Sequence, residues 1–249
     1  MSVHLGVLRA IQLKLIENDL YVSFMLTYGS NMNKSAGVDP GLAVLLEKAP
    51  GEILDYGFVM DCLRRYKNPR VKLNYLLKAE ALIRVKKGIY IFGKKVARHP
   101  YSSEVLANMI YGPSYVSLEW ACQYYRLIPE RVMTVTSIST KRSKQFQTPI
   151  GLFTYDHLPI EIFSVGVTLV KFSDTQYARM ATKEKALTDL LVLRRGGFSS
   201  RKHFEETLFE DLRVEEEDIM NLDLIQLNEI YQARPHSAIK YLIEYRNHE

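Results

Sequence analysis

Residues 68–92 read NPRVKLNYLLKAEALIRVKKGIYIF, and this stretch decides how the first part of the chain folds. Asn68-Pro69 is typical of a helix start, because proline at the first helical position loses no intrahelical hydrogen bond. Residues 82–92 place alternating apolar side chains on either side of Lys87-Gly88, which predicts a two-stranded hairpin whose turn needs a glycine at positive φ. Between the two lies an apolar stripe at helical spacing, formed by Leu73, Leu76 and Leu77.

Two shorter helices are expected ahead of this stretch. Asp39-Pro40 repeats the cap-and-proline pattern, and the leucines that follow have helical spacing up to Pro50-Gly51. A second short helix is expected over Phe58–Arg65. Three short helices followed by a hairpin is the order of a winged helix-turn-helix, which we assign to residues 32–98. In that arrangement the third helix enters the major groove of DNA and the hairpin lies along the adjacent backbone.

Charge is unevenly distributed along the chain. The net charge is +5, but residues 64–98 hold twelve basic residues against one acid, Glu80, a local net charge of +11. Residues 201–249 hold six basic and twelve acidic residues, a net charge of −6. A polyanion is the simplest partner of the basic block, since each neutralised phosphate releases counterions. A solvated lysine-rich face is the alternative, and some winged helices bind only proteins; the charge ratio favours double-stranded DNA.

The expected DNA-binding residues come from the third helix and the hairpin. Arginine and asparagine side chains can read base edges, while lysines mostly hold phosphates. From the helix we select Arg70, Lys72, Asn74, Tyr75 and Lys78, and from the hairpin Arg84, Lys86 and Lys87.

The composition changes after residue 98, and residues 99–249 are expected to form a second domain. Helices are predicted from about Ser103 to Tyr111, after Ser117 as N-cap, and over residues 182–197. Strands are predicted within residues 131–140, in a hairpin over 144–159, and within 165–172 and 177–182. The remainder is expected to be mostly helical and acidic. The predicted fold class is α+β: an N-terminal winged helix-turn-helix, then a mixed α/β domain with a helical tail.

A second basic run lies between a predicted strand and a predicted hairpin. Lys141, Arg142 and Lys144 put three cations within four residues. They form either a solvated loop or a second anion patch that touches nucleic acid or an acidic partner surface.

Catalytic and metal sites are not expected. Asp156 and His157 are neighbours on a predicted strand and point to opposite faces, so they cannot readily act together, and His157 is read as structural. Glutamates near helix starts complement the helix dipole and lack metal-ligand spacing. No phosphate-loop or dinucleotide fingerprint is present. We therefore expect no catalytic residue, no metal and no cofactor.

Residues 1–31 are interpreted as an N-terminal extension. Their apolar stretch is interrupted by charges, so neither a membrane span nor a signal peptide is predicted. A start codon assigned too early would explain them, with Met32 as the natural start. Cys62 and Cys122 have no metal spacing and read as buried thiols of a reducing compartment, so a cytoplasmic protein without a membrane partner is expected.

The chain also resembles a known family. The stretches YVSLEWACQYYRLIPE (115–130), TVTSISTKRSKQFQTPIGLFTYDHLP (134–159) and ATKEKALTDLL (181–191) resemble the C-terminal domain of AbiEi-type antitoxins of type IV abortive-infection toxin–antitoxin systems. The basic block ending in LIRVKKGIYIF (82–92) is similar to their N-terminal DNA-binding domain. The resemblance covers about residues 38–195 and makes 99–249 an antitoxin-like domain with an acidic helical tail. The extra N-terminal stretch and the acidic run 215–218 have no match in it.

The resemblance implies a repressor that binds inverted repeats in its own operon. It also implies an antitoxin that counters a nucleotidyltransferase-like toxin without forming a stable complex with it. The alternatives are an orphan winged-helix regulator whose C-terminal domain binds a ligand or a protein, and a nuclease carried by a DNA-binding domain.

Overall fold

The computed structural model describes residues 38–194 and 197–247. The expected N-terminal extension, residues 1–31, lies outside them. The chain divides into two compact units, residues 1–47 and 48–249. Residues 48–98 and 99–249, which the sequence assigns to separate domains, thus belong to one unit. We refer to residues 48–98 as the N-terminal lobe and to residues 99–247 as the C-terminal lobe.

In the first unit the described residues begin helix α2, Pro40–Lys48. The Asp39 carboxylate accepts hydrogen bonds from the N–H groups of Gly41, at 2.9 Å, and Leu42, at 3.2 Å. Leu42 and Leu45 are buried. The cap predicted from Asp39-Pro40 is therefore confirmed.

The N-terminal lobe combines two helices with a three-stranded antiparallel sheet. Its elements are β1 (Ile53–Asp55), α3 (Tyr56–Cys62), α4 (Pro69–Lys78), β2 (Leu82–Lys86) and β3 (Ile89–Phe92). The strand order is β1-β3-β2, so the predicted hairpin is confirmed and β1 extends it. The helix expected over Phe58–Arg65 begins earlier and ends at Cys62, because the Asp55 carboxylate caps it by accepting from Phe58 N–H at 2.9 Å. At α4, Pro69 is in the first turn, but the Asn68 side chain makes no capping bond.

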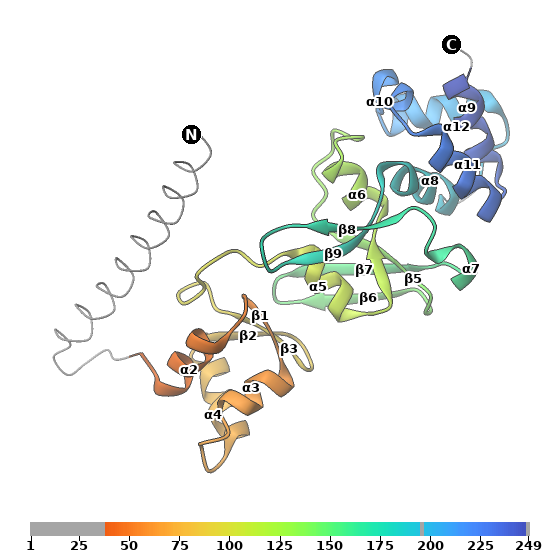
Figure 1. The fold of residues 1–249 in the computed structure, drawn as a ribbon. Helices are drawn as coiled ribbons and strands as arrows, with labels where there is room; N and C mark the ends of the chain where they lie inside the picture. The colour runs from red at the N-terminus through yellow and green to blue at the C-terminus, as the bar shows by residue number, and fades with distance from the viewer. Residues whose placement is uncertain (1–37, 195–196, 248–249) are drawn as a thin grey trace, which may run out of the picture. The chain divides into compact units, whose positions relative to one another are not determined.

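The C-terminal lobe is built on a six-stranded mixed sheet in the order β6-β7-β5-β4-β9-β8 (Figure 1). Its strands are β4 (Ser114–Val116), β5 (Val135–Ser139), β6 (Lys144–Thr148), β7 (Gly151–His157), β8 (Val167–Lys171) and β9 (Tyr177–Ala181). The hairpins β6–β7 and β8–β9 confirm the sequence expectation. Helices α5 (Ser103–Ile110), α6 (Leu118–Tyr124) and α7 (Ile160–Phe163) connect the strands.

Helix α8, Lys183–Leu193, starts at the predicted cap Thr182 and contacts α6, α11 and α12. The tail that follows is helical, as predicted, and Figure 1 shows its helices gathered beside α8. Its elements are α9 (Arg201–Glu206), a π-helical turn (Thr207–Asp211), α10 (Glu216–Met220), α11 (Leu224–Ala233) and α12 (Ser237–Asn247). The core of this lobe includes fully buried aromatic side chains, Tyr115, Phe153, Tyr155 and Phe204. The fold is therefore mixed, with helices and two sheets.

A buried polar network connects α8 to the sheet. The Lys185 ammonium lies 2.9 Å from one Asp189 carboxylate oxygen, and both side chains are at most 3% exposed. The other carboxylate oxygen accepts hydrogen bonds from Tyr115 and Ser117, each at 2.9 Å. Burial raises the pKa of Tyr115, and the neighbouring Asp189 carboxylate raises it further. Ser117 occupies the predicted N-cap position of α6, but its hydroxyl donates to Asp189 instead of capping the helix.

Among the described residues, no helix combines the length and apolar character needed to cross a membrane.

Candidate nucleic-acid interface

Helix α4 presents one exposed face that is polar and basic. Leu73 and Leu76 point into the lobe and are buried. Four residues apart on the outer side lie Arg70, Asn74 and Lys78, all exposed, so they form one stripe along the helix. Next to this stripe, Val71 and Tyr75 are 65% and 55% exposed, which leaves an aromatic and an aliphatic group facing solvent. The helix contains no acidic residue.

Contacts with tyrosine rings restrain two cations of α4. Arg70 Nε donates a hydrogen bond to the hydroxyl of Tyr56, the first residue of α3, at 3.1 Å. Lys72 Nζ lies 5.0 Å from the ring centre of Tyr66 and 4.7 Å from that of Tyr75, within cation–π range. These contacts restrict side chains that would otherwise sample many rotamers, so less conformational entropy is lost when they meet a ligand.

The hairpin β2–β3 turns at Lys87-Gly88, as predicted. Gly88 has φ +91°, and a side chain there would meet nothing within 4 Å, so glycine is needed for its backbone angle and not for space. Its carbonyl accepts from Tyr56 N–H at 2.9 Å, which ties the turn to the start of α3. Lys87 is exposed at the turn, and the Arg84 guanidinium lies 5.8 Å from the ring centre of Tyr90 on the opposite strand.

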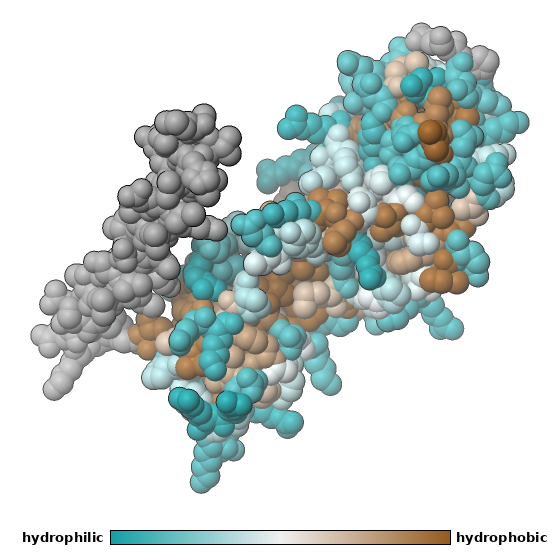
Figure 2. Space-filling model, in the orientation of Figure 1, coloured by the Kyte–Doolittle hydropathy of each residue, from teal (hydrophilic) through white to brown (hydrophobic). Residues whose placement is uncertain are grey.

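A groove of about 870 Å³ runs between the C-terminal part of α4 and strand β2. Among the described residues that line it are four cations, Lys78, Arg84, Lys94 and Lys95, and one carboxylate, Glu80; Asn74 also lines it. We call it the basic groove. It brings together three of the predicted site residues and adds Lys94 and Lys95, which the site prediction omits although they follow the hairpin directly. Figure 2 shows further hydrophilic side chains projecting from the end of this lobe where the α3–α4 connection lies.

Lys86 does not accompany Arg84. The pairing of β2 with β3 shifts between these two residues, and this irregularity separates the directions of their side chains. Lys86 is half-buried: its ammonium donates to the carbonyl of Ile110, at 2.5 Å, and lies 4.6 Å from the ring centre of Phe146. The wing lysine therefore contacts the C-terminal lobe.

The contacts of Lys86 join it to the second basic run. Lys144 Nζ lies 5.1 Å from the ring centre of Phe146, and Lys141 Nζ lies 5.3 Å from that of Tyr111. The rings of Tyr111 and Phe146 are themselves in contact, with centroids 5.4 Å apart. We call these five residues the lysine–aromatic patch. Burial lowers the pKa of Lys86, and the Lys144 and Lys141 charges lower it further, which shows that the three ammonium groups repel one another.

Backbone contacts hold the loop that carries the patch. Tyr111 donates its hydroxyl to the carbonyl of Arg142, at 3.1 Å, while the Arg142 side chain is exposed. His157 Nδ1 lies 3.1 Å from the carbonyl oxygen of Lys141, and its N–H donates to the Ser143 hydroxyl. These contacts give His157 a role in positioning the loop.

Within residues 38–194 and 197–247, no group of three or more His, Cys, Asp or Glu side chains is arranged to hold a metal ion. Glu104 and Glu184, which lie near helix starts, accept hydrogen bonds from within the chain: Glu104 from Ser102 and Trp120, and Glu184 from Asp223 N–H.

Comparison with known proteins supports the fold alone. No family model and no curated protein matches the chain. The fold is similar to that of the crystal structure of the RV2827C protein from Mycobacterium tuberculosis, with a TM-score of 0.56 and 11% sequence identity. The similarity covers 87% of this chain and 80% of that one, so it extends over both lobes.

Proposed function

We propose that the protein is a DNA-binding transcriptional repressor whose first elements form a winged helix-turn-helix. The observation that carries the proposal is the basic groove, where four cations line one surface between a helix and a hairpin strand. The element order α2–β1–α3–α4–β2–β3 agrees with that motif. A surface with this charge attracts a polyanion, because binding releases condensed counterions.

Helix α4 is the proposed recognition helix. Asn74, at the middle of its exposed stripe, offers an amide that can pair with an adenine edge in two places, and Arg70 can do the same with guanine. Arg84 and Lys87 on the hairpin, together with Lys94 and Lys95 beside it, hold phosphates.

The lysine–aromatic patch is the proposed second contact with the phosphate backbone. Lys141, Arg142 and Lys144 are exposed, and the Lys86 ammonium adds to their potential. Three cations that repel one another gain from an anion placed between them, which supports the reading as an anion patch over that of a solvated loop.

The proposed operator is an inverted repeat in the protein's own operon, and the proposed biological role is that of a cytoplasmic type IV antitoxin. The sequence resemblance to AbiEi-type antitoxins supports this role. Its test is co-expression: the protein should relieve growth arrest caused by the product of a neighbouring nucleotidyltransferase-like gene, without co-purifying with it. Arrest that persists would leave a repressor without a toxin, acting through a ligand or a protein partner.

The DNA-binding proposal is tested by fluorescence anisotropy with labelled upstream DNA. Affinity should exceed that for a scrambled duplex and fall linearly with log salt between about 50 and 200 mM. The variant R70A/K72A/K78A should lose operator binding. A matched variant, R131A/K202A/K240A, removes three exposed cations of the C-terminal lobe and should bind as the wild type does. Operator affinity that survives the first triple change would refute α4 as the recognition helix.

A further inference from the structure

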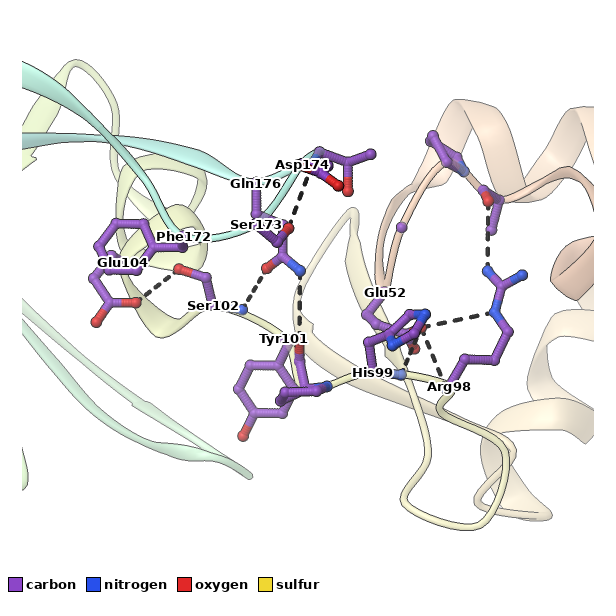
Figure 3. A pocket seen from close by; sticks show the side chains of 15 residues that line it. Glu52, Arg98, His99, Tyr101, Ser102, Glu104, Phe172, Ser173, Asp174 and Gln176 are labelled. Atoms are coloured by element: carbon purple, nitrogen blue, oxygen red, sulfur yellow. Dashed lines mark hydrogen bonds and ion pairs between the residues drawn. The ribbon is translucent and has the colours of Figure 1, made fainter. Parts of the chain in front are cut away.

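A cavity of about 670 Å³ lies between three segments that are distant in the sequence. Its walls are the residues before β1 (49–52), the linker between the lobes (98–102) and the β8–β9 turn (172–176), as Figure 3 shows. Its volume is within the range of about 300–1,000 Å³ that is usual for small-molecule sites. None of the eleven DNA-binding or anion-patch residues selected from the sequence lines it.

One buried carboxylate in this cavity is only half satisfied. Glu52 is 2% exposed. Its Oε1 accepts from the backbone N–H groups of Arg98, at 3.3 Å, and His99, at 3.2 Å, and lies 3.8 Å from the Arg98 guanidinium. Its Oε2 is buried, and no described residue donates a hydrogen bond to it. Leaving a buried charged acceptor unpaired costs about 1–3 kcal/mol or more, so such an atom calls for a partner from outside the chain.

The charges of the lining select the sign of that partner. The described residues around the cavity include three carboxylates, on Glu52, Glu104 and Asp174, and one guanidinium, on Arg98. With His99 neutral the formal charge is −2, in a chain whose net charge is +5. The two oxygens of Glu104 accept from the Ser102 hydroxyl, at 2.7 Å, and from the Trp120 indole, at 3.0 Å, so donors hold this carboxylate in place.

Aromatic groups supply the remaining recognition surface. Tyr101 and Phe172 line the cavity, and aromatic faces attract cations as well as apolar groups. Figure 3 shows Phe172 and Glu104 towards one end of the lining and Glu52, Arg98 and His99 towards the other. A ligand that spans the cavity would therefore meet an aromatic ring and a carboxylate.

We propose that this cavity binds a small organic cation, an amine or guanidinium compound, whose N–H group donates to Glu52 Oε2 while its apolar part packs on Tyr101 and Phe172. Because Oε2 is covered in this structure, binding requires the exposed His99 side chain to turn aside. The required hydrogen bond is charge-assisted, the strongest class available to a small ligand.

The same site holds the linker that joins the lobes. Gln176 accepts from Ser102 N–H at 2.6 Å and donates to the carbonyl of Pro100 at 3.4 Å, while Glu52 holds the N–H groups of Arg98 and His99. A ligand that binds Glu52 acts on a segment anchored to both lobes. A consequence for operator affinity follows, and that consequence, unlike the binding itself, rests on the proposed DNA-binding function.

Isothermal titration calorimetry of the full chain tests the binding, with agmatine and tyramine as probes. At least one should bind saturably with a Kd at or below about 1 mM, while 4-hydroxyphenylacetate, which replaces the tyramine amine with a carboxylate, should not. E52Q should weaken binding at least about tenfold by removing the negative charge. T175W should block it, because Thr175 is an exposed lining residue whose enlargement fills the cavity without entering the core. E161Q, at an exposed carboxylate elsewhere, should bind as the wild type does.

Weaker binding of both cations, or binding that E52Q and T175W leave unchanged, would overturn the proposal. T175W keeps the test valid if E52Q fails to fold, since a change at an exposed turn does not touch the Glu52 contacts. Operator affinity measured with and without the bound probe gives the second readout, with T175W as the control for direct effects of the cation on DNA. Calorimetric binding without any operator binding would sustain the cavity and refute the repressor; the opposite result would sustain the repressor and refute the cavity.

Discussion

Removing three cations of the basic groove should weaken DNA binding by an amount that the structure allows us to calculate. The variant K78A/R84A/K94A removes one cation from the end of α4, one from β2 and one from the segment after β3. All three side chains are exposed, so their truncation should leave the fold intact. The variant therefore separates loss of charge from loss of structure.

The expected magnitude follows from counterion release. Each phosphate neutralised contributes about 0.9 to the slope of log affinity against log salt, so three lost contacts reduce the slope by about 2.7. At about 0.1 M salt this corresponds to a loss of roughly 500-fold in affinity, or about 3.7 kcal/mol. The loss should shrink as salt rises, since there is less counterion entropy to release.

The assay is fluorescence anisotropy with the operator duplex at four or more salt concentrations. The R131A/K202A/K240A variant, which changes net charge equally, is the control. If both triple variants changed the slope by the same amount, the effect would belong to the total charge of the protein. If the groove variant kept the wild-type slope, the groove would not contact phosphate and the argument from its charge would fail.

Three further predictions concern stability. K185M should lower the free energy of unfolding by about 3–5 kcal/mol, because it leaves the Asp189 carboxylate buried without its cation; a loss below about 1 kcal/mol in urea denaturation would contradict this. G93A should destabilise the protein by about 1–3 kcal/mol or more in the same assay, because an added Cβ would lie 1.8 Å from the carbonyl oxygen of Glu80, whereas G51A meets only a side-chain atom at 3.5 Å and should be nearly neutral. Burial lowers the pKa of His236 below 6.5, so the unfolded chain binds the proton more tightly and stability should fall as pH falls through the region below 6.5; H236Q should flatten this dependence of the melting temperature, and an unchanged profile would exclude His236 as its source.

The parts of the fold that sequence reasoning predicted are those with strong local signals. Proline at the first helical position, the leucine stripe of α4 and glycine at the turn each act within a few residues, and all three are confirmed. The error at α3 has a local cause as well. Asp55 caps this helix, but it follows the three-residue strand β1, which is too short to show alternation, so neither boundary was visible in the sequence.

Contacts between distant residues account for what the sequence could not show. Glu52 meets Arg98 and His99 across more than forty positions, and no pattern of spacing indicates that a glutamate before β1 is buried against the linker. Ser117 is a second case: its position is that of a cap, yet Asp189, far along the chain, takes its hydrogen. Sequence reasoning identifies what a side chain can do, while tertiary contacts decide which partner it has.

Lys86 shows how this limit affects the count of DNA contacts. From the sequence, all twelve cations of residues 64–98 could meet phosphate, which would give a salt slope of roughly −11 per bound chain. The register shift in β2 directs Lys86 to the Ile110 carbonyl, and Arg64 pairs with Asp61 at 3.3 Å. One helix face and one hairpin cannot present every remaining cation to a single duplex at once. The measured slope should therefore be well short of the sequence limit, and a slope near −11 would mean that the cations outside the basic groove, including those of the C-terminal lobe, also contact DNA.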